Sequence, residues 1–154
     1  TFDDLSKTVT PLDSSLTVTP GRLAELMNAM QQRGSLYARA RGVHTSALAD
    51  GEQLVAVAED VGRHNTIDKL RGDCLLRGID PAGMILLATG RISSEMIGKA
   101  ARMRCPVVVS RTSPTSVSVR LAREWNITLV GYLRRGKMNV YAHEERLKVM
   151  NNGE

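Results

Sequence analysis

The sequence predicts an α/β protein, a three-layer α/β/α sandwich built on a mixed sheet. Apolar segments of four to six residues alternate along the chain with segments of 11–15 residues whose apolar positions recur at helical spacing. The short segments are apolar throughout, which is typical of strands that helices cover on both faces. The length of 154 residues and the hydrophobic fraction of 42% suit one domain with a buried core.

The predicted elements follow a polar start. Residues 1–19 are rich in Thr, Ser and Asp, so we expect a linker there and a domain at residues 20–154. Pro20 begins a predicted helix that Gly34 ends. We then expect a turn at 42–44 and an extended segment after it. The other predicted elements are strands near 36–40, 54–58, 84–88, 107–110, 127–133 and 138–141, and helices at 65–77, 93–104 and 114–125.

Composition narrows the class of partner. Aromatic residues make up only 3% of the chain and no nucleic-acid-binding motif occurs, so we expect no nucleic-acid partner. No apolar run approaches the roughly 18 residues of a membrane helix, and the first ten residues lack signal-peptide character. Cys74 and Cys105 have no nearby partner and fall on predicted core positions, which favours inert thiols in a reducing compartment. We therefore expect a soluble, cytoplasmic protein with no membrane partner.

Positive charge is concentrated in the C-terminal half of the chain. Residues 1–77 carry a net charge of −1 and residues 78–154 a net charge of +6. This asymmetry predicts either an anionic partner, such as a phosphorylated small molecule or an acidic protein, or a solvated basic surface.

Three predicted strands end in polar residues, where open α/β sheets bind their ligands. The first polar string, Glu59–Asn65, precedes a predicted helix. Asp60 or Asn65 would cap that helix, which leaves Glu59, Arg63 and His64 without a structural role. The sequence therefore predicts a functional role for this string.

The second polar string is Thr89–Glu95. Gly90 allows a ligand to approach the backbone closely, and Arg91 with the free N–H groups of a helix start would form an anion site. A tight turn followed by a helix that Ser93 caps explains the same residues without a ligand. Both interpretations stay open for this string.

The third polar string is Ser110–Ser116. Ser113 and Pro114 suit an N-cap and a first helical turn, but the other hydroxyl groups exceed what capping needs. Together the second and third strings would hold a phosphate or pyrophosphate. A basic turn at Arg134–Lys137 would clamp such a ligand, or is an ordinary exposed hairpin turn.

No motif identifies the ligand or a reaction. The chain has neither a P-loop nor a G-x-G-x-x-G fingerprint. A zinc deaminase would need H-x-E and P-C-x-x-C, but His44 precedes Thr45 and no C-x-x-C occurs. There is no G-x-S-x-G elbow, and His143 lacks a second His for a metal. We therefore expect no metal site and a chain better equipped to bind than to catalyse.

Four strings carry a family resemblance. They are Glu59–Lys69 (EDVGRHNTIDK), Thr89–Met96 with Lys99-Ala100, Ser110–Thr115 and Asn139–Tyr141, in this order between about Gly42 and Leu147. Together they resemble the FdhD family of formate dehydrogenase accessory proteins.

The resemblance implies a fold like that of cytidine deaminase without its zinc, in a protein that is typically a dimer. Members are cytoplasmic sulfur carriers. They take sulfur from a cysteine desulfurase as a persulfide on a Cys-x-x-Cys loop. They pass it to the molybdenum or tungsten bis(molybdopterin guanine dinucleotide) cofactor of formate dehydrogenase, and their C-terminal domain holds the guanine dinucleotide. For this chain the resemblance implies the Mo or W form of that cofactor as bound cargo, GDP as a surrogate ligand, and cysteine desulfurase, formate dehydrogenase and a second copy as partners.

The strand ends and the resemblance together give the expected cofactor-binding residues. They are Tyr132, Leu133, Arg134, Arg135, Gly136, Lys137, Arg63, His64, Asn65, Gly90, Arg91, Ser94, Ser110, Thr112, Ser113 and Thr115. The chain departs from the family where Arg41–His44 replaces Gly-Gly-x-His and where the Cys-x-x-Cys is absent. We therefore expect a C-terminal fragment that keeps cofactor binding, with sulfurtransferase activity left to the full-length protein.

Two other functions remain open. A small-molecule enzyme acting on a phosphorylated or nucleotide substrate would use His64 as acid or base beside its acidic neighbours. A basic adaptor would dock an acidic partner through Arg134 and Arg135. The clustering of polar residues at strand ends favours the cofactor-binding domain.

Overall fold

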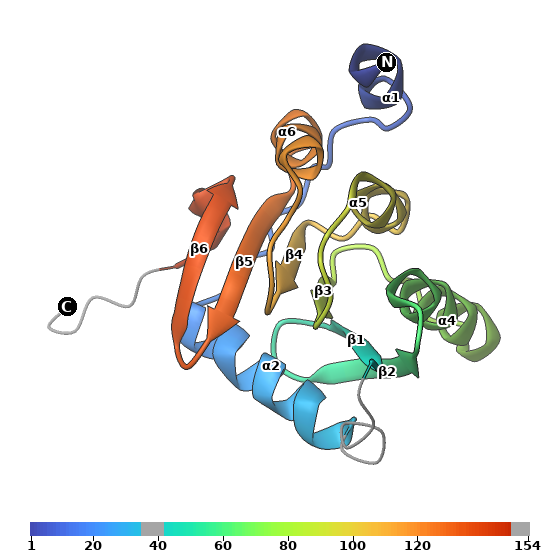
Figure 1. Ribbon diagram of the computed structural model, residues 1–154, viewed down its shortest axis with the longest axis vertical. Helices are drawn as coiled ribbons and strands as arrows, with labels where there is room; N and C mark the ends of the chain where they lie inside the picture. Colours follow the sequence, from blue (N-terminus) through green and yellow to red (C-terminus); the bar gives the residue numbers. More distant parts are fainter. Residues whose placement is uncertain (35–41, 149–154) are drawn as a thin grey trace, which may run out of the picture.

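The computed structural model describes residues 1–34 and 42–148. A six-stranded mixed sheet of order β2-β1-β3-β4-β5-β6 forms its centre (Figure 1). The strands are β1 (His44–Ala49), β2 (Leu54–Asp60), β3 (Ile85–Ala88), β4 (Val107–Ser110), β5 (Thr128–Arg134) and β6 (Lys137–Ala142). The helices are α1 (Phe2–Ser6), α2 (Pro20–Arg33), α4 (Arg63–Arg77), α5 (Ser94–Arg102) and α6 (Ser116–Glu124), followed by the 3-10 turn η1 (Glu144–Arg146).

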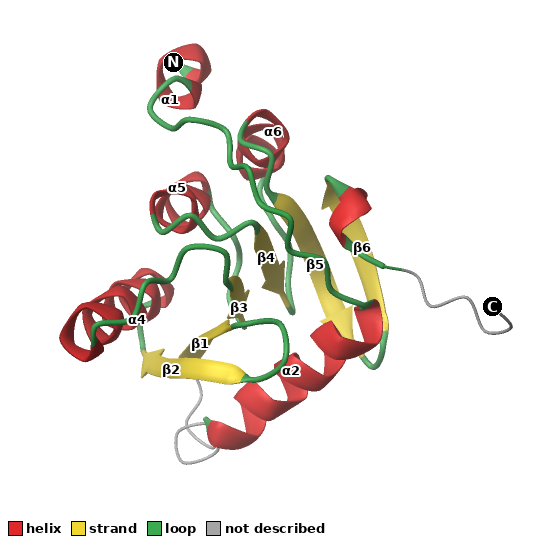
Figure 2. Cartoon of the chain, turned by 180° about the vertical axis from the view of Figure 1, so that it is seen from behind, coloured by secondary structure: helices red, strands yellow, loops and turns green. Residues whose placement is uncertain are grey.

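Helices cover both faces of the sheet. Helix α2 lies against one face, and α4, α5 and α6 lie against the other (Figures 1 and 2). The alternation along β3 explains this arrangement, because Ile85 and Leu87 belong to the core under α2, whereas Leu86 and Ala88 belong to the core under the other helices. The predicted three-layer α/β/α sandwich with a mixed sheet is confirmed.

Strand direction gathers the polar strand ends at one edge of the sheet. Strands β3, β4 and β5 run parallel, and β1 runs antiparallel to both β2 and β3. Strand β2 therefore points the same way as β3. The last residues of β2, β3, β4 and β5 and the turn between β5 and β6 all lie along one edge, which we call the carboxyl edge.

Helix α2 forms as its sequence predicts. Its N-cap Thr19 accepts a hydrogen bond from the backbone N–H of Arg22 at 3.1 Å, and Pro20 occupies the first helical position. The apolar stripe of the helix is buried, with Leu23 and Met30 fully inaccessible to solvent. Burying each such side chain stabilises the fold by about 1.5–3 kcal/mol.

Residues 1–19, expected as a linker, pack against the helical layer and the sheet. The indole Nε1 of Trp125 donates to the carbonyl of Ser6 at 2.8 Å, and the side chain of Asn126 donates to the carbonyl of Leu12 at 2.7 Å. Leu12 and Val18 are buried in the core. A few apolar anchors spread through a polar segment thus fix it to the domain.

Several element boundaries differ from the prediction. Helix α6 begins at Ser116, with Thr115 and not Ser113 as its N-cap, because the segment around Pro114 pairs with Ile92 in a short parallel bridge and stays extended. His44, expected in a turn, begins β1. The strand predicted near 36–40 lies outside the described residues.

Helix α4 also begins two residues earlier than predicted, at Arg63. Its N-cap residue is Gly62, and no side chain accepts a capping hydrogen bond at this helix start. The prediction that Asp60 or Asn65 caps the helix is therefore wrong. Asp60 accepts instead from the Gly62 N–H at 2.9 Å and from the Asn65 amide at 3.2 Å. The carboxylate thus fixes the turn that precedes the helix.

Helix α4 also engages the outer strand of the sheet. Lys69 Nζ donates to the carbonyl of Glu59 at 2.8 Å, and Arg77 Nη1 donates to the carbonyl of Val55 at 3.1 Å. Both carbonyls belong to β2, the first strand in the sheet order. Two cations of one helix therefore hold the backbone of this edge strand.

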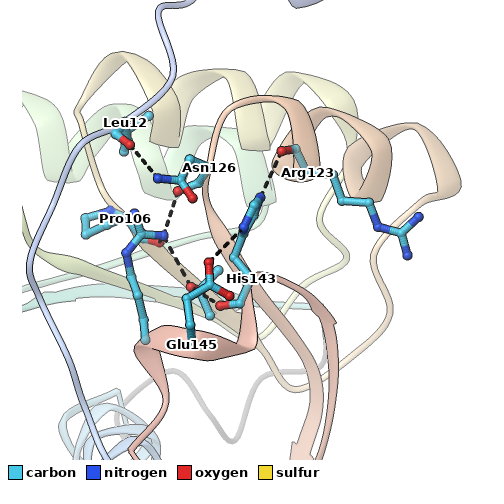
Figure 3. A network of polar contacts seen from close by, with 8 residues as sticks. Leu12, Pro106, Arg123, Asn126, His143 and Glu145 are labelled. Atoms are coloured by element: carbon cyan, nitrogen blue, oxygen red, sulfur yellow. Dashed lines mark hydrogen bonds and ion pairs between the residues drawn. The ribbon is translucent and has the colours of Figure 1, made fainter.

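A buried arginine, Arg146 of η1, binds the sheet at the end opposite the carboxyl edge, where β4 and β5 begin. Arg146 is 5% exposed, and its Nη1 donates to the carbonyls of Asn126 at 2.6 Å and Pro106 at 3.3 Å and to Thr128 Oγ1 at 3.3 Å. Burial lowers the pKa of this guanidinium. His143 lies beside it, between the Glu145 carboxylate and the Arg123 carbonyl (Figure 3).

Candidate functional site

A cleft of about 830 Å³ lies at the carboxyl edge, between α2 and the hairpin of β5 and β6. Its lining residues are Ala24, Met27, Asn28, Gln31, Arg111, Tyr132, Leu133, Arg134, Arg135, Gly136 and Lys137. Four of these described lining residues are cationic and none is acidic. The cleft therefore concentrates positive potential and favours an anionic ligand. We call it the basic cleft.

The turn of the hairpin places three of the four cations. Arg135 and Gly136 both have positive φ, 53° and 75°, and Arg134 pairs with Lys137 across them. Positive φ at both central residues is the geometry that closes a two-residue hairpin with the twist of the strands. The turn thus presents Arg134, Arg135 and Lys137 from one short segment.

Hydrogen bonds to two backbone carbonyls anchor the hairpin to the loop after β4. Arg134 Nε donates to the carbonyl of Arg111 at 2.8 Å, and the Tyr132 N–H donates to the carbonyl of Thr112 at 3.0 Å. The neighbouring segments approach Gly131 so closely that a Cβ there would lie 2.9 Å from Tyr141 Cε2 and 3.0 Å from the Thr112 carbonyl oxygen. Glycine is therefore required at this crossing.

Tyr132 departs from ordinary strand geometry. Its φ is 54°, a left-handed conformation that costs an aromatic residue free energy. The register of β5 and β6 shifts between Gly131 and Arg134, so Tyr132 sits at an irregular position of the ladder. Its side chain is 42% exposed, and the Arg134 guanidinium lies 5.9 Å from the ring centroid. An exposed aromatic residue thus stands beside Arg134 among the lining residues of the cleft.

Three of the hydroxyl groups predicted to bind phosphate are engaged within the protein. Ser110 Oγ donates to the carbonyl of Gly90 at 2.6 Å, and Thr112 Oγ1 donates to the carbonyl of Thr89 at 3.3 Å. Thr115 Oγ1 accepts from the Ser118 N–H as the N-cap of α6. The first two contacts join the loops after β3 and β4, and the third begins α6.

The string that follows β2 forms a separate polar cluster at the same edge. His64 Nδ1 lies 3.6 Å from Glu95 Oε2, beyond hydrogen-bond distance. Arg63 packs beside Gly90 and His44, since a Cβ on Gly90 would lie 3.2 Å from Arg63 Cβ and 3.1 Å from His44 Nδ1. Within the described chain, Arg63 Nε and His64 Nδ1 are buried atoms without a hydrogen-bond partner.

The structure therefore divides the predicted site residues into two groups. All of Tyr132–Lys137 line the basic cleft. The residues of the β2, β3 and β4 ends lie along the same edge but not among its lining residues: Arg63, His64, Asn65, Gly90, Arg91, Ser94, Ser110, Thr112, Ser113 and Thr115. Their participation in binding stays a prediction.

Sequence reasoning missed three polar residues of the cleft. Arg111 lay within the third polar string but was not singled out, although it follows β4 directly. Asn28 and Gln31 line the cleft from α2. Their spacing of three residues, which puts two amides on one side of a helix, was the available signal.

The cysteines lie away from the cleft. Both are buried, and burial raises the pKa of the Cys105 thiol to about 12 and raises that of Cys74. Across residues 1–34 and 42–148, no three His, Cys, Asp or Glu side chains gather in a way that could hold a metal ion. Over the same ranges, no helix is long and apolar enough to span a bilayer.

Comparison with known proteins connects this chain to one family. Residues 1–148 match the model of the FdhD/NarQ family. A curated relative from Bacillus subtilis, named sulfur carrier protein FdhD, is 40% identical over 96% of this chain and 56% of its own length. A relative of the same name from Staphylococcus haemolyticus is 39% identical over 88% of this chain and 51% of its own length. The chain thus spans about half the length of these relatives.

Solved structures agree with this connection. A crystal structure described as a proposed formate dehydrogenase accessory protein from Desulfotalea psychrophila has a TM-score of 0.83 and 31% identity, over 94% of this chain and 62% of that one. A deaminase/reductase from Thermotoga maritima, a diaminohydroxyphosphoribosylaminopyrimidine deaminase by description, has a TM-score of 0.53 at 16% identity, over 71% of this chain and 37% of that one. This second likeness concerns the fold alone, and the cytidine-deaminase-like description stays a prediction. The family model and the curated relatives together establish that the chain belongs to the FdhD/NarQ family.

Proposed function

We propose that this chain is the cofactor-binding part of a formate dehydrogenase accessory sulfur carrier. It binds the guanine dinucleotide end of the Mo- or W-bis(molybdopterin guanine dinucleotide) cofactor, which is its cargo, in the basic cleft. The observation that carries the proposal is the gathering of Arg111, Arg134, Arg135 and Lys137 around a cleft of about 830 Å³.

The chemistry of the cleft fits a dinucleotide. A pyrophosphate carries two or more negative charges, and arginine guanidinium groups bind phosphate oxygens through paired N–H donors. Asn28 and Gln31 add amide donors and acceptors on the opposite wall, and Tyr132 adds an exposed aromatic ring. The lining therefore offers partners for the phosphates, for polar base edges and for a planar ring.

The sulfur-carrier role and the partners are also part of this proposal. Relatives that bear the name sulfur carrier protein support it. In the full-length protein, a persulfide from a cysteine desulfurase would supply sulfur to the bound cofactor, and the product would pass to formate dehydrogenase in the cytoplasm, with the carrier as a homodimer. Because both cysteines here are buried, we place the persulfide on neither Cys74 nor Cys105.

Calorimetric titration tests the binding proposal. We expect GDP to bind the wild-type chain more tightly than ADP, and the Arg134→Ala/Arg135→Ala variant to lose most of this affinity. The matched control is Arg71→Ala/Arg102→Ala, which removes two exposed arginines from α4 and α5 and leaves the cleft intact. Equal loss in both double variants, or no preference for GDP over ADP, would contradict the proposal.

A second candidate function rests on the polar cluster after β2. Acid–base chemistry on a phosphorylated or nucleotide substrate would use His64, whose Nδ1 is buried without a partner in the described chain and lies 3.6 Å from the Glu95 carboxylate. An assay of phosphate release from GTP or GDP measures this activity. Turnover that His64→Ala abolishes would favour this enzyme over the binding domain.

A further inference from the structure

Arg111 joins three elements around the basic cleft. It follows β4, and its carbonyl accepts a hydrogen bond from Arg134 Nε at 2.8 Å. Its guanidinium reaches across to α2, where one terminal atom of the Gln31 side-chain amide lies 2.7 Å from Nη1 and 3.0 Å from Nε, at the place of an acceptor. The opposite orientation of this amide would set N–H donors against N–H donors, so the oxygen is the atom that faces the guanidinium.

We infer that Gln31 is the positioning residue of the basic cleft, which fixes the guanidinium of Arg111 for an anionic ligand. A guanidinium has five N–H donors in one plane. Gln31 engages two of them from one side, so the plane is fixed and the other donors remain available. An arginine held in this way loses less side-chain freedom when an anion binds. The inference rests on the proposed function, because it names the residue that sets the affinity of that same cleft.

The neutrality of Gln31 is part of the inference. A carboxylate at this position would hold Arg111 at least as firmly, but it would cancel one positive charge of the cleft. An amide oxygen supplies the two hydrogen bonds and leaves the charge in place. Since none of the described lining residues is acidic, Arg111 keeps its full attraction for a phosphate.

A measurement without ligand tests the contact itself. The ¹H–¹⁵N resonance of Arg111 Nε, identified by its disappearance in Arg111→Lys, reports whether this N–H is held. We expect it to be protected from solvent exchange in the wild type and in Gln31→Glu, and to broaden beyond detection in Gln31→Met, which keeps the side-chain volume without an acceptor. Asn28→Ala, one turn earlier on the same cleft wall, should leave the resonance unchanged. An unchanged resonance in Gln31→Met would overturn the inference.

A double-mutant cycle then tests the consequence for binding. We expect Gln31→Met to weaken GDP binding about tenfold in the wild-type background and less than about twofold in Arg111→Ala. Gln31→Glu should keep the Arg111 Nε resonance. It should still weaken GDP binding, because it adds a negative charge to the cleft. Equal losses in both backgrounds would mean that Gln31 acts on the ligand directly and would overturn the inference. If the wild type fails to bind GDP, the proposed function fails, and the resonance still decides whether Gln31 holds Arg111.

Discussion

Lys69 Nζ lies 2.8 Å from the Asp60 carboxylate and donates at the same distance to the carbonyl of Glu59. The carboxylate also accepts from the Gly62 N–H and from the Asn65 amide. These contacts close the turn between β2 and α4. The Lys69 ammonium, followed by the two N–H donors, lowers the pKa of Asp60 from 3.8 to about 2.

This depressed pKa predicts an acid-sensitive contribution to stability. The folded protein favours ionised Asp60, so the contribution is present above pH 3.8 and is lost as the pH falls through about 2. We expect Asp60→Asn to remove this part of the pH dependence, as measured by urea unfolding across that range. Asp13→Asn, at an exposed carboxylate outside the turn, should keep the wild-type slope. If stability depends on pH in Asp60→Asn as steeply as in the wild type, the acid-sensitive contribution does not come from Asp60.

Removing the buried arginine should destabilise the fold without touching the cleft. Arg146→Met leaves the carbonyl of Asn126 and the hydroxyl of Thr128 without their buried donor. We expect a loss of about 2–4 kcal/mol in the free energy of unfolding, measured with urea. Arg123→Ala is the control, because that side chain points away from the network, which uses only its backbone carbonyl (Figure 3). Equal effects of the two variants would exclude a structural role for the buried guanidinium.

Two glycine-to-alanine substitutions should change the free energy of unfolding in opposite directions. A Cβ at Gly131 would lie within 3.0 Å of the Pro114 ring and of the Thr112 carbonyl oxygen, so Gly131→Ala should cost about 1–3 kcal/mol and weaken GDP binding through the displaced hairpin. A Cβ at Gly72 meets nothing within 4 Å in the middle of α4, so Gly72→Ala should stabilise the protein by about 0.5–1 kcal/mol. Thermal unfolding and GDP titration measure both effects. A neutral Gly131→Ala would show that the crossing has more room.

The buried cysteines should resist modification. Burial raises the pKa of Cys105 to about 12, so the thiolate is essentially absent at pH 8. We expect iodoacetamide to leave Cys105 unmodified in the native protein and to label both cysteines once guanidinium chloride unfolds it, as read by mass spectrometry. Rapid native labelling of Cys105 would reveal an exposed, reactive thiol.

Local sequence signals predicted most of the fold. Helix α2 begins at Pro20 and ends before Gly34, as those two residues indicate, and Ser93 caps α5, as one of the two interpretations of its string has it. The hairpin turn at Arg134–Lys137 also follows from its local sequence. Each of these features depends on hydrogen bonds between residues within four positions of one another, so a single segment carries the information.

Features that depend on distant segments were not predicted. The start of α6 shifts because Ile92, more than twenty positions away, pairs with Pro114. The anchoring of Leu12 needs Asn126, which no local pattern in residues 1–19 indicates. The contact between Gln31 and Arg111 was not predicted for the same reason, since the two residues meet only when the sandwich has formed.

The cations that α4 extends over β2 also affect how the protein behaves at high concentration. An edge strand offers its outward N–H and C=O groups to any extended peptide, which is how sheets recruit strands and aggregate. On β2, the carbonyls of Val55 and Glu59 already accept from Arg77 and Lys69, and an incoming strand would have to displace both charged side chains. Strand β2 is therefore protected against intermolecular sheet extension by the same lysine that closes the turn into α4.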